Sequence, residues 1–107
     1  MNGIPQLSPV ELKQRIDAGE DLLILDVREP HEYQIANLGG KLIPLGQIPT
    51  RLAELDPGRE IVVHCKMGGR SQRAAEFLRQ AGYAKVSNLA GGIHAWSREV
   101  DAALPLY

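Results

Sequence analysis

A second cysteine is absent from this sequence of 107 residues, which contains only Cys65. A lone cysteine excludes an intramolecular disulfide, so the fold depends on packing and not on covalent crosslinks. A single free thiol is typical of proteins kept in a reducing compartment, and we expect a cytoplasmic protein. It also raises the question of whether this thiol is chemically reactive.

Long hydrophobic runs are missing as well. The longest unbroken aliphatic run is residues 22–25, whereas a membrane-spanning helix needs about 20 apolar residues. The first basic side chain, Lys13, is not followed by an apolar segment, so no signal peptide is expected. The formal net charge is only −1, which gives no general attraction to nucleic acids or to membrane surfaces. We expect neither as a partner.

The patterns that hold metals and dinucleotides are also lacking. One cysteine and three scattered histidines provide no pair of ligands at the spacing of zinc sites. No expected strand is followed by the G-x-G-x-x-G pattern of dinucleotide-binding folds. The sequence therefore indicates neither a metal site nor a bound cofactor.

What the sequence does contain is the composition of a globular domain. Hydrophobic residues make up 44% and charged residues 23%, enough apolar surface to offset the entropy of an ordered chain. The length corresponds to one domain, and no repeat or linker interrupts it. Residues 1–107 are therefore expected to form a single domain.

Short apolar segments alternate with helical segments along the chain. Buried strands are predicted at residues 22–25, 61–63 and 86–89, and a short edge strand at 41–45. Helices are predicted at 8–19, 29–33, 50–55, 71–81 and 93–100. Strands that alternate with helices pair in parallel through right-handed crossovers, which predicts an α/β sheet covered on both faces.

The helix expected over residues 71–81 is the most regular in the chain. Its apolar residues recur at helical spacing, which predicts a stripe facing the sheet formed by Ala74, Phe77, Leu78 and Ala81. The only tryptophan, Trp96, is expected to anchor the packing of the last helix, because a ring this large stabilises a small core.

Polar residues follow two of the expected strands. One strand ends at Asp26-Val27-Arg28 and another ends at His64-Cys65. Ligands of parallel α/β sheets bind beyond the carboxyl ends of the strands, so we expect the functional site there. Asp26 and Arg28 are interpreted as a structural ion pair that supports the site. The side chain of His64 should point to the opposite face from Cys65 and is not expected to act as its base.

The loop after Cys65 reads Lys66-Met67-Gly68-Gly69-Arg70-Ser71. Two adjacent glycines let the backbone curl so that successive N–H groups point inward and can bind an anion. The helix that begins near Arg70 and Ser71 adds free N–H groups and the positive end of its dipole. Arg70 adds a permanent charge and a two-pronged geometry suited to an oxyanion. These groups should hold Cys65 as a thiolate, with a pKa below that of free cysteine.

Basic residues gather around this loop. Residues 61–85 hold five basic side chains and one acidic side chain, against six basic and ten acidic in residues 1–60. A solvated helix face would also explain such a cluster. Because the cluster surrounds the only thiol, we favour a functional interpretation.

These segments resemble the rhodanese-homology domain. The matching motifs are Asp26–Glu29 with Glu32-Tyr33, the loop Cys65–Ser71, and Asn88–Ile93 with Trp96. The resemblance implies a three-layer α/β fold with a five-stranded parallel sheet and helices on both faces. It also implies sulfur transfer through a persulfide on Cys65, without a metal or an organic cofactor. The residues that would bind the persulfide and the sulfur donor are Lys66, Met67, Gly68, Gly69 and Arg70.

A narrower resemblance concerns the same loop together with Leu104–Tyr107. These segments are similar to the rhodanese domain at the C-terminus of fused adenylyltransferase–sulfurtransferases, which activate ubiquitin-like sulfur-carrier proteins. The implied partners are a small donor such as thiosulfate or a persulfide donor protein, and a sulfur-carrier protein as acceptor. No adenylylation domain accompanies these 107 residues, so the chain is either an excised domain or a free-standing relative.

Two other functions fit parts of the pattern. A cysteine-dependent phosphatase also combines a thiolate, backbone N–H groups and an arginine, but it resembles C-x5-R, whereas four residues separate Cys65 from Arg70 here. A phosphatase also needs an acid for the leaving group, and no candidate stands out. A non-catalytic binding module of the same fold is the third alternative, and the presence of both Cys65 and Arg70 argues against it.

Overall fold

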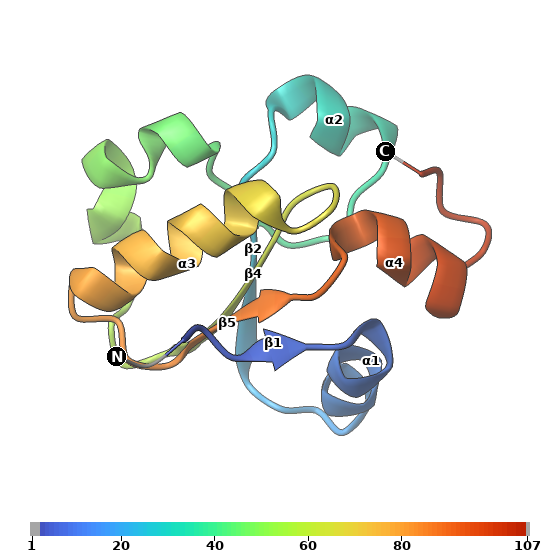
Figure 1. The fold of residues 1–107 in the computed structure, drawn as a ribbon, viewed down its shortest axis with the longest axis horizontal. Helices are drawn as coiled ribbons and strands as arrows, with labels where there is room; N and C mark the ends of the chain where they lie inside the picture. The colour runs from blue at the N-terminus through green and yellow to red at the C-terminus, as the bar shows by residue number, and fades with distance from the viewer. Residues whose placement is uncertain (1–2, 107) are drawn as a thin grey trace.

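The computed structural model describes residues 3–106. In this part of the chain, five parallel strands form one sheet in the order β1-β5-β4-β2-β3 (Figure 1). The strands are β1 (Gln6–Leu7), β2 (Leu22–Asp26), β3 (Lys41–Leu42), β4 (Glu60–His64) and β5 (Val86–Leu89). The helices are α1 (Pro9–Asp17), α2 (Pro30–Ile35), α3 (Gly69–Gln80) and α4 (Gly92–Glu99), with the 3-10 helices η1 (Leu45–Gln47) and η2 (Pro49–Glu54). The expected α/β fold with a five-stranded parallel sheet is confirmed.

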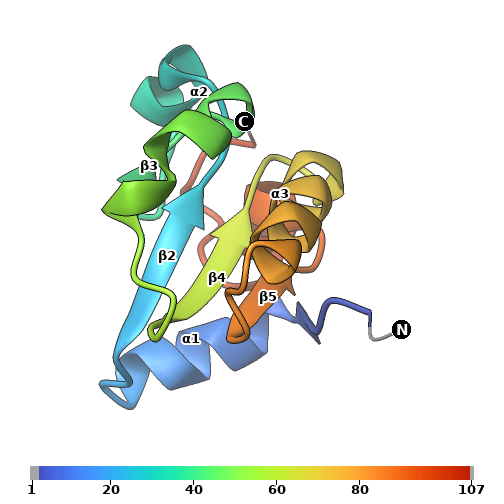
Figure 2. The same cartoon turned by 90° about the vertical axis from the view of Figure 1, so that its left-hand side faces the viewer.

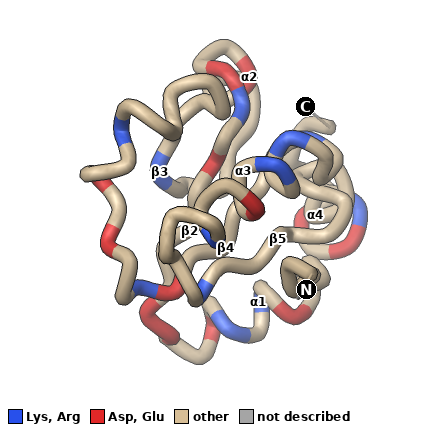
Figure 3. The backbone as a smooth tube through the Cα atoms, turned by 60° about the vertical axis from the view of Figure 1, so that its left-hand side comes forward, with Lys and Arg blue, Asp and Glu red and all other residues tan. Residues whose placement is uncertain are grey.

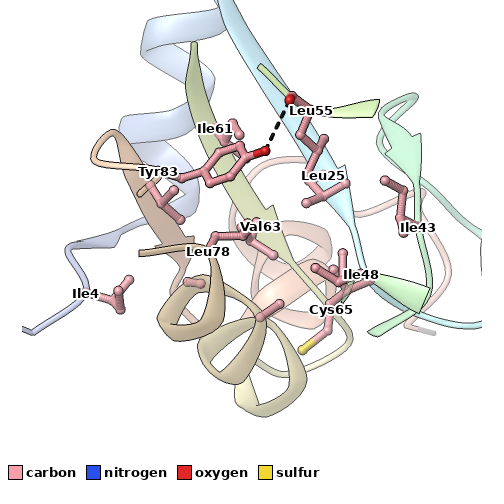
Figure 4. Packing of buried hydrophobic residues seen from close by; sticks show 14 residues of the cluster. Ile4, Leu25, Ile43, Ile48, Leu55, Ile61, Val63, Cys65, Leu78 and Tyr83 are labelled. Atoms are coloured by element: carbon pink, nitrogen blue, oxygen red, sulfur yellow. Dashed lines mark hydrogen bonds between the residues drawn. The ribbon is translucent and has the colours of Figure 1, made fainter. Parts of the chain in front are cut away.

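The sheet separates two hydrophobic clusters, because successive side chains of a strand point to opposite faces. Ile61 and Val63 of β4 pack in the cluster under α3, which Figure 4 shows at close range. Val62, between them, packs on the other face with Leu12 of α1 and Trp96 of α4. The expected packing role of Trp96 is thereby confirmed, and the fold has the three layers that the resemblance implied.

The carboxyl ends of β2 and β4 lie side by side. Their parallel register pairs Leu22 with Glu60 at one end and Asp26 with His64 at the other. Helix α2 follows β2 at this edge, and the loop after β4 leads into α3 (Figure 2). The sheet thus brings the residues that follow both strands to the same edge, as the sequence predicted.

The apolar stripe of α3 differs from the expected one. Its buried residues are Ser71, Ala74, Ala75 and Leu78, whereas Phe77 is 38% exposed and Ala81 is exposed. The prediction for Phe77 and Ala81 was therefore wrong. The buried stripe begins at a serine, which faces the thiol of Cys65, so an apolar pattern could not reveal it.

Two short strands differ from their predictions. Strand β3 contains only Lys41 and Leu42, and it lies at the edge of the sheet, where the following proline is tolerated. Strand β1 was missed, because two residues carry no periodicity; it pairs with β5 through Gln6 and Leu7. No helix of residues 3–106 is long and apolar enough to cross a bilayer.

Candidate active site

Cys65 directly follows β4, and its residue is only 1% exposed. Its side chain borders the hydrophobic cluster under α3, beside Val63 and Ile48, with the sulfur at the end of the cluster (Figure 4). The strand therefore supplies a rigid base for the thiol. The following loop, residues 65–71, which we name the Cys65 loop, surrounds the sulfur with donors.

Backbone N–H groups of the Cys65 loop point at the sulfur. The N–H of Gly68 lies 3.0 Å from Sγ, and the N–H of Ser71, in the first turn of α3, lies 3.4 Å from it. Gly68 has φ of +111°, a conformation that L side chains rarely adopt, so glycine at this position allows the turn. The N–H of Ser71 belongs to a helix start, where the first donors have no partner within the helix.

The environment of Cys65 changes its pKa in two opposing ways. Burial raises the pKa of the thiol, because it disfavours the charged form. Hydrogen bonds from the hydroxyl and N–H of Ser71 and from the N–H groups of Gly68 and Met67 lower it, and together they prevail. The net result is a lowered pKa, which favours a nucleophilic thiolate.

The hydroxyl of Ser71 lies within reach of three acceptors. These are Sγ of Cys65 at 3.4 Å, the carbonyl oxygen of Gly68 at 3.2 Å, and Oδ1 of Asn88, the shortest contact of the three. A hydroxyl has one proton to donate, so it serves one of them at a time. The amide of Asn88 also donates to the Gly68 carbonyl at 3.4 Å and to Oε1 of Gln6 at 3.1 Å.

Asn88 is a site residue that reading the sequence did not identify. It occurred in a matched motif, but only the pairing of β5 with β4 brings it beside the Cys65 loop. It is 3% exposed, and a buried amide must satisfy its polar groups. Its contacts to Ser71 and Gly68 link β5 to the Cys65 loop.

The sequence led us to expect that the guanidinium of Arg70 would point at an open anion site. In the structure it points at a carboxylate instead. Its Nη1 and Nη2 donate to Oε1 and Oε2 of Glu32 at 2.7 and 2.9 Å. Glu32, on α2, is almost fully buried, and the hydrogen bonds and charge of Arg70 lower its pKa to about 2. Glu32 was also missed as a site residue, because 38 residues separate it from Arg70 in the sequence.

Asp26 and Arg28 form the expected ion pair beneath the site. Both side chains are fully buried, and Nη2 of Arg28 lies 2.7 Å from Oδ2 of Asp26. Arg28 also donates to the carbonyl oxygens of Glu32 and Ala36 at 3.4 and 2.6 Å. The Ala36 carbonyl lies just after α2, where helical partners are missing, whereas the Glu32 carbonyl also accepts from the N–H of Ala36 at 3.2 Å. The pair thus holds α2, and with it Glu32, at the edge of the sheet.

His64 lies away from the thiol, as strand alternation predicted. It is fully buried, and its Nε2 lies 3.7 Å from Oδ2 of Asp26. Burial, assisted by the positive charge of Arg28, lowers the pKa of His64 to about 4, although Asp26 opposes the change. His64 is therefore a neutral residue near pH 7.

The start of α4 fixes the backbone of the Cys65 loop from below. The N–H groups of Ile93 and His94 donate to the carbonyl oxygens of Cys65 and Lys66 at 2.9 and 3.0 Å. A Cβ on Gly92 would lie 2.5 Å from both carbonyl oxygens, so only glycine permits this approach. The helix start thus immobilises the segment that carries the thiol.

The remaining predicted residues of the loop lie toward its surface. Met67 is 63% exposed and Gly69 is exposed, whereas Lys66 and Arg70 are half-buried. The structure therefore brings Gly68 and Ser71 to the sulfur and leaves Met67 and Gly69 facing solvent. Within residues 3–106, no group of three or more His, Cys, Asp or Glu side chains could hold a metal ion.

The thiol has a lowered pKa, lies at the carboxyl edge of a parallel sheet and is surrounded by N–H donors. These features define an α/β domain with a cysteine at its candidate active site. A family model described as a rhodanese-like domain matches residues 8–99, and the chain belongs to this family.

Its relatives include enzymes of sulfur transfer. The chain is 38% identical over 96 residues to a sulfurtransferase of Allochromatium vinosum, covering 89% of this chain and 90% of that protein. It is 36% identical over 118 residues to the adenylyltransferase and sulfurtransferase MOCS3-1 of Zea mays, covering 100% of this chain and 25% of that protein. Family membership and these relatives support a role in sulfur transfer.

The same architecture occurs in solved structures. A rhodanese-related protein from Thermoplasma volcanium superposes with a TM-score of 0.83 at 28% identity, covering 96% of this chain and 99% of that one. In length, this chain corresponds to only part of several relatives. It spans 25% of the maize protein and 55% of YrkF from Bacillus subtilis, which is 39% identical over 101 residues.

Proposed function

We propose that the chain is a thiosulfate-type sulfurtransferase that carries sulfane sulfur as a persulfide on Cys65. The observation that supports this most directly is the set of N–H donors around Sγ, from Gly68 at 3.0 Å and from Ser71 at 3.4 Å. Donors fixed in advance around a sulfur anion stabilise both the attacking thiolate and a terminal persulfide anion. Residues 1–107 act as one domain in this proposal.

The reaction proceeds in two displacements. The Cys65 thiolate attacks the outer sulfur of thiosulfate, a new S–S bond forms on Cys65, and sulfite leaves with the electron pair of the broken bond. A thiophilic acceptor then attacks the outer sulfur of the persulfide and regenerates the thiolate. Cyanide serves as this acceptor in vitro, and the Cys65 loop from Lys66 to Arg70 binds the donor. No metal or organic cofactor takes part.

A protein acceptor is part of the proposal. The maize relative combines adenylyltransferase and sulfurtransferase in its name. We infer a ubiquitin-like sulfur-carrier protein as a partner of this chain, and a persulfide donor protein as an alternative source of sulfur. The lone, activated thiol supports a reducing, cytoplasmic setting for this chemistry.

Intact-mass measurement after incubation with thiosulfate tests the proposal. We expect the wild-type protein to gain one sulfur that dithiothreitol removes, and Cys65→Ser to gain none, because a hydroxyl cannot form a persulfide. The matched control, Cys65→Ser/Ala81→Cys, restores one thiol on the exposed end of α3, away from the N–H donors. It should also fail to load.

Two outcomes would contradict the proposal. If Cys65→Ser still transferred sulfur from thiosulfate to cyanide, Cys65 would not be the carrier. If the wild-type protein instead hydrolysed an aryl phosphate efficiently and Cys65→Ser did not, the site would be that of a cysteine-dependent phosphatase.

A further inference from the structure

The ion pair between Glu32 and Arg70 joins α2 to the Cys65 loop, which contains Arg70. It joins α2 to the first turn of α3, and its two hydrogen bonds occupy both terminal nitrogens of the guanidinium. The Arg70 side chain is 31% exposed, whereas that of Glu32 is 9% exposed. Figure 3 shows acidic positions around α2 and basic positions at the start of α3. The arginine of the Cys65 loop therefore faces a carboxylate of the protein itself.

We propose that Glu32 determines the charge selectivity of the site, by engaging Arg70 and so disfavouring dianionic donors such as thiosulfate relative to organic persulfides. This inference rests on the proposed function and narrows its donor class. Glu32 acts through Arg70 and not on the reacting atoms, so it is a specificity-determining residue.

The charges around Cys65 largely cancel in pairs. Asp26 is paired with Arg28 at 2.7 Å, and Glu32 is paired with Arg70. The Cys65 thiolate favours the charged form of Arg70, yet one N–H of each terminal nitrogen of Arg70 is bonded to Glu32. Attraction for an incoming anion then comes from the backbone N–H groups of the Cys65 loop.

The two donor classes place different demands on this arrangement. Thiosulfate brings a charge of −2 to a thiolate of −1, and sulfite leaves with −2. An organic persulfide R–S–SH brings no net charge when protonated: the thiolate bonds to its outer sulfur, which keeps the proton, and R–S⁻ leaves with the electron pair. Only the first reaction needs a cation with free donors near the sulfur, because like charges must meet there.

Glu32→Gln separates the charge of Glu32 from its structural contact. Oε1 of Glu32 also accepts a hydrogen bond from the N–H of Glu29 at 2.9 Å, which helps to begin α2. The amide oxygen of glutamine can keep this hydrogen bond, whereas the negative charge is removed. Glu32→Met, which is similar in length, provides a second variant if the glutamine protein does not fold.

The test compares alkylation of Cys65 by iodoacetate, an anion, and iodoacetamide, its neutral analogue. The ratio of the two rates reports anion selectivity at the sulfur and does not require sulfur transfer. We expect Glu32→Gln to raise this ratio by about fivefold, since a nearby negative charge is removed and Arg70 loses its counterion and one of its two hydrogen bonds to this side chain. Sulfur loading from thiosulfate, which carries two charges, should increase more than the iodoacetate ratio does.

Two further variants make the test specific. Glu20→Gln removes the same charge from the ion pair with Arg15, at the amino end of β2, and should leave the ratio unchanged. In the double variant Glu32→Gln/Arg70→Gln, the gain should disappear, because no guanidinium is released.

Three results would overturn the inference. They are an unchanged ratio in a folded Glu32 variant, an equal rise in Glu20→Gln, or a gain that persists without Arg70. Failure of the proposed function itself looks different, because no donor would then load sulfur on Cys65 whatever the alkylation ratio.

Discussion

The hydroxyl of Ser71, in the first turn of α3, donates a hydrogen bond to Oδ1 of Asn88, near the end of β5. This contact connects the start of α3 with β5. The Asn88 amide then reaches the Gly68 carbonyl on the Cys65 loop and Gln6 on β1. One buried amide thus connects three elements around the thiol.

We predict that Asn88→Ala destabilises the protein by about 2 kcal/mol, because it removes a buried amide and its hydrogen bonds to Ser71, Gly68 and Gln6. Urea unfolding measures the change. Asn37→Ala, which removes a half-buried asparagine bonded to the Tyr33 carbonyl, is the control and should cost less. Equal losses in the two variants would show that the Asn88 network adds no special stability.

Ser71→Ala should raise the pKa of Cys65, because the Ser71 hydroxyl, which can turn from Asn88 to Sγ, favours the thiolate. The midpoint of the pH dependence of iodoacetamide modification should therefore move to higher pH. Ser97→Ala is the matched control: Ser97 is a buried serine of α4 whose hydroxyl donates to the Leu104 carbonyl. An unchanged midpoint in Ser71→Ala would mean that the backbone N–H groups alone set the reactivity of the thiol.

Breaking the buried ion pair should be costly. Asp26→Asn leaves the charge of Arg28 buried without its counterion, and we expect a loss of about 3–5 kcal/mol in urea unfolding. Asp26→Leu/Arg28→Met, which removes both charges, should lose less than the single variant does.

The control for this experiment is Asp21→Asn, which breaks the pair of Asp21 with Arg59. The Asp21 side chain is 86% exposed, so little change is expected. If Asp26→Asn and Asp21→Asn lowered the free energy of unfolding by similar amounts, burial would not explain the cost of breaking an ion pair.

Stability should fall in mild acid because of His64. Its pKa is lowered from 6.5 to about 4, so the unfolded chain binds a proton between these values and the folded protein does not. Stability is therefore complete above pH 6.5 and decreases as the pH falls, by about 3 kcal/mol near pH 4. The carboxylates with lowered pKa, such as Glu32, contribute to this loss of stability only below about pH 4.5.

His64→Phe should flatten the dependence of the urea midpoint on pH between 6.5 and 4.5, where His64 dominates. His94→Phe changes a half-buried histidine on α4 and should keep the slope of the wild type. If both variants kept it, the acid sensitivity would come from other groups.

Much of the fold could be read from local patterns. The capping box at Ser8, the strands at residues 22–25 and 61–63, and the glycine turn before α3 are all local signals, and the structure contains each of them, although residues 22–24 are only half-buried. The short strand β1 and the rotated stripe of α3 were not predictable in this way. A two-residue strand has no period, and Ser71 is buried because a sulfur and an amide face it.

The sequence by itself determined the lone cysteine at a strand end, the loop that follows it and the α/β class, because strand ends, glycines and helix starts are set by neighbouring residues. Only the tertiary structure decided what Arg70 faces and what lies beneath Ser71. Glu32 is 38 residues from Arg70, and Asn88 is 17 residues from Ser71. Such contacts depend on which strands pair and where a helix is held, and hydrogen-bond partners at those separations leave no periodic signal in the chain.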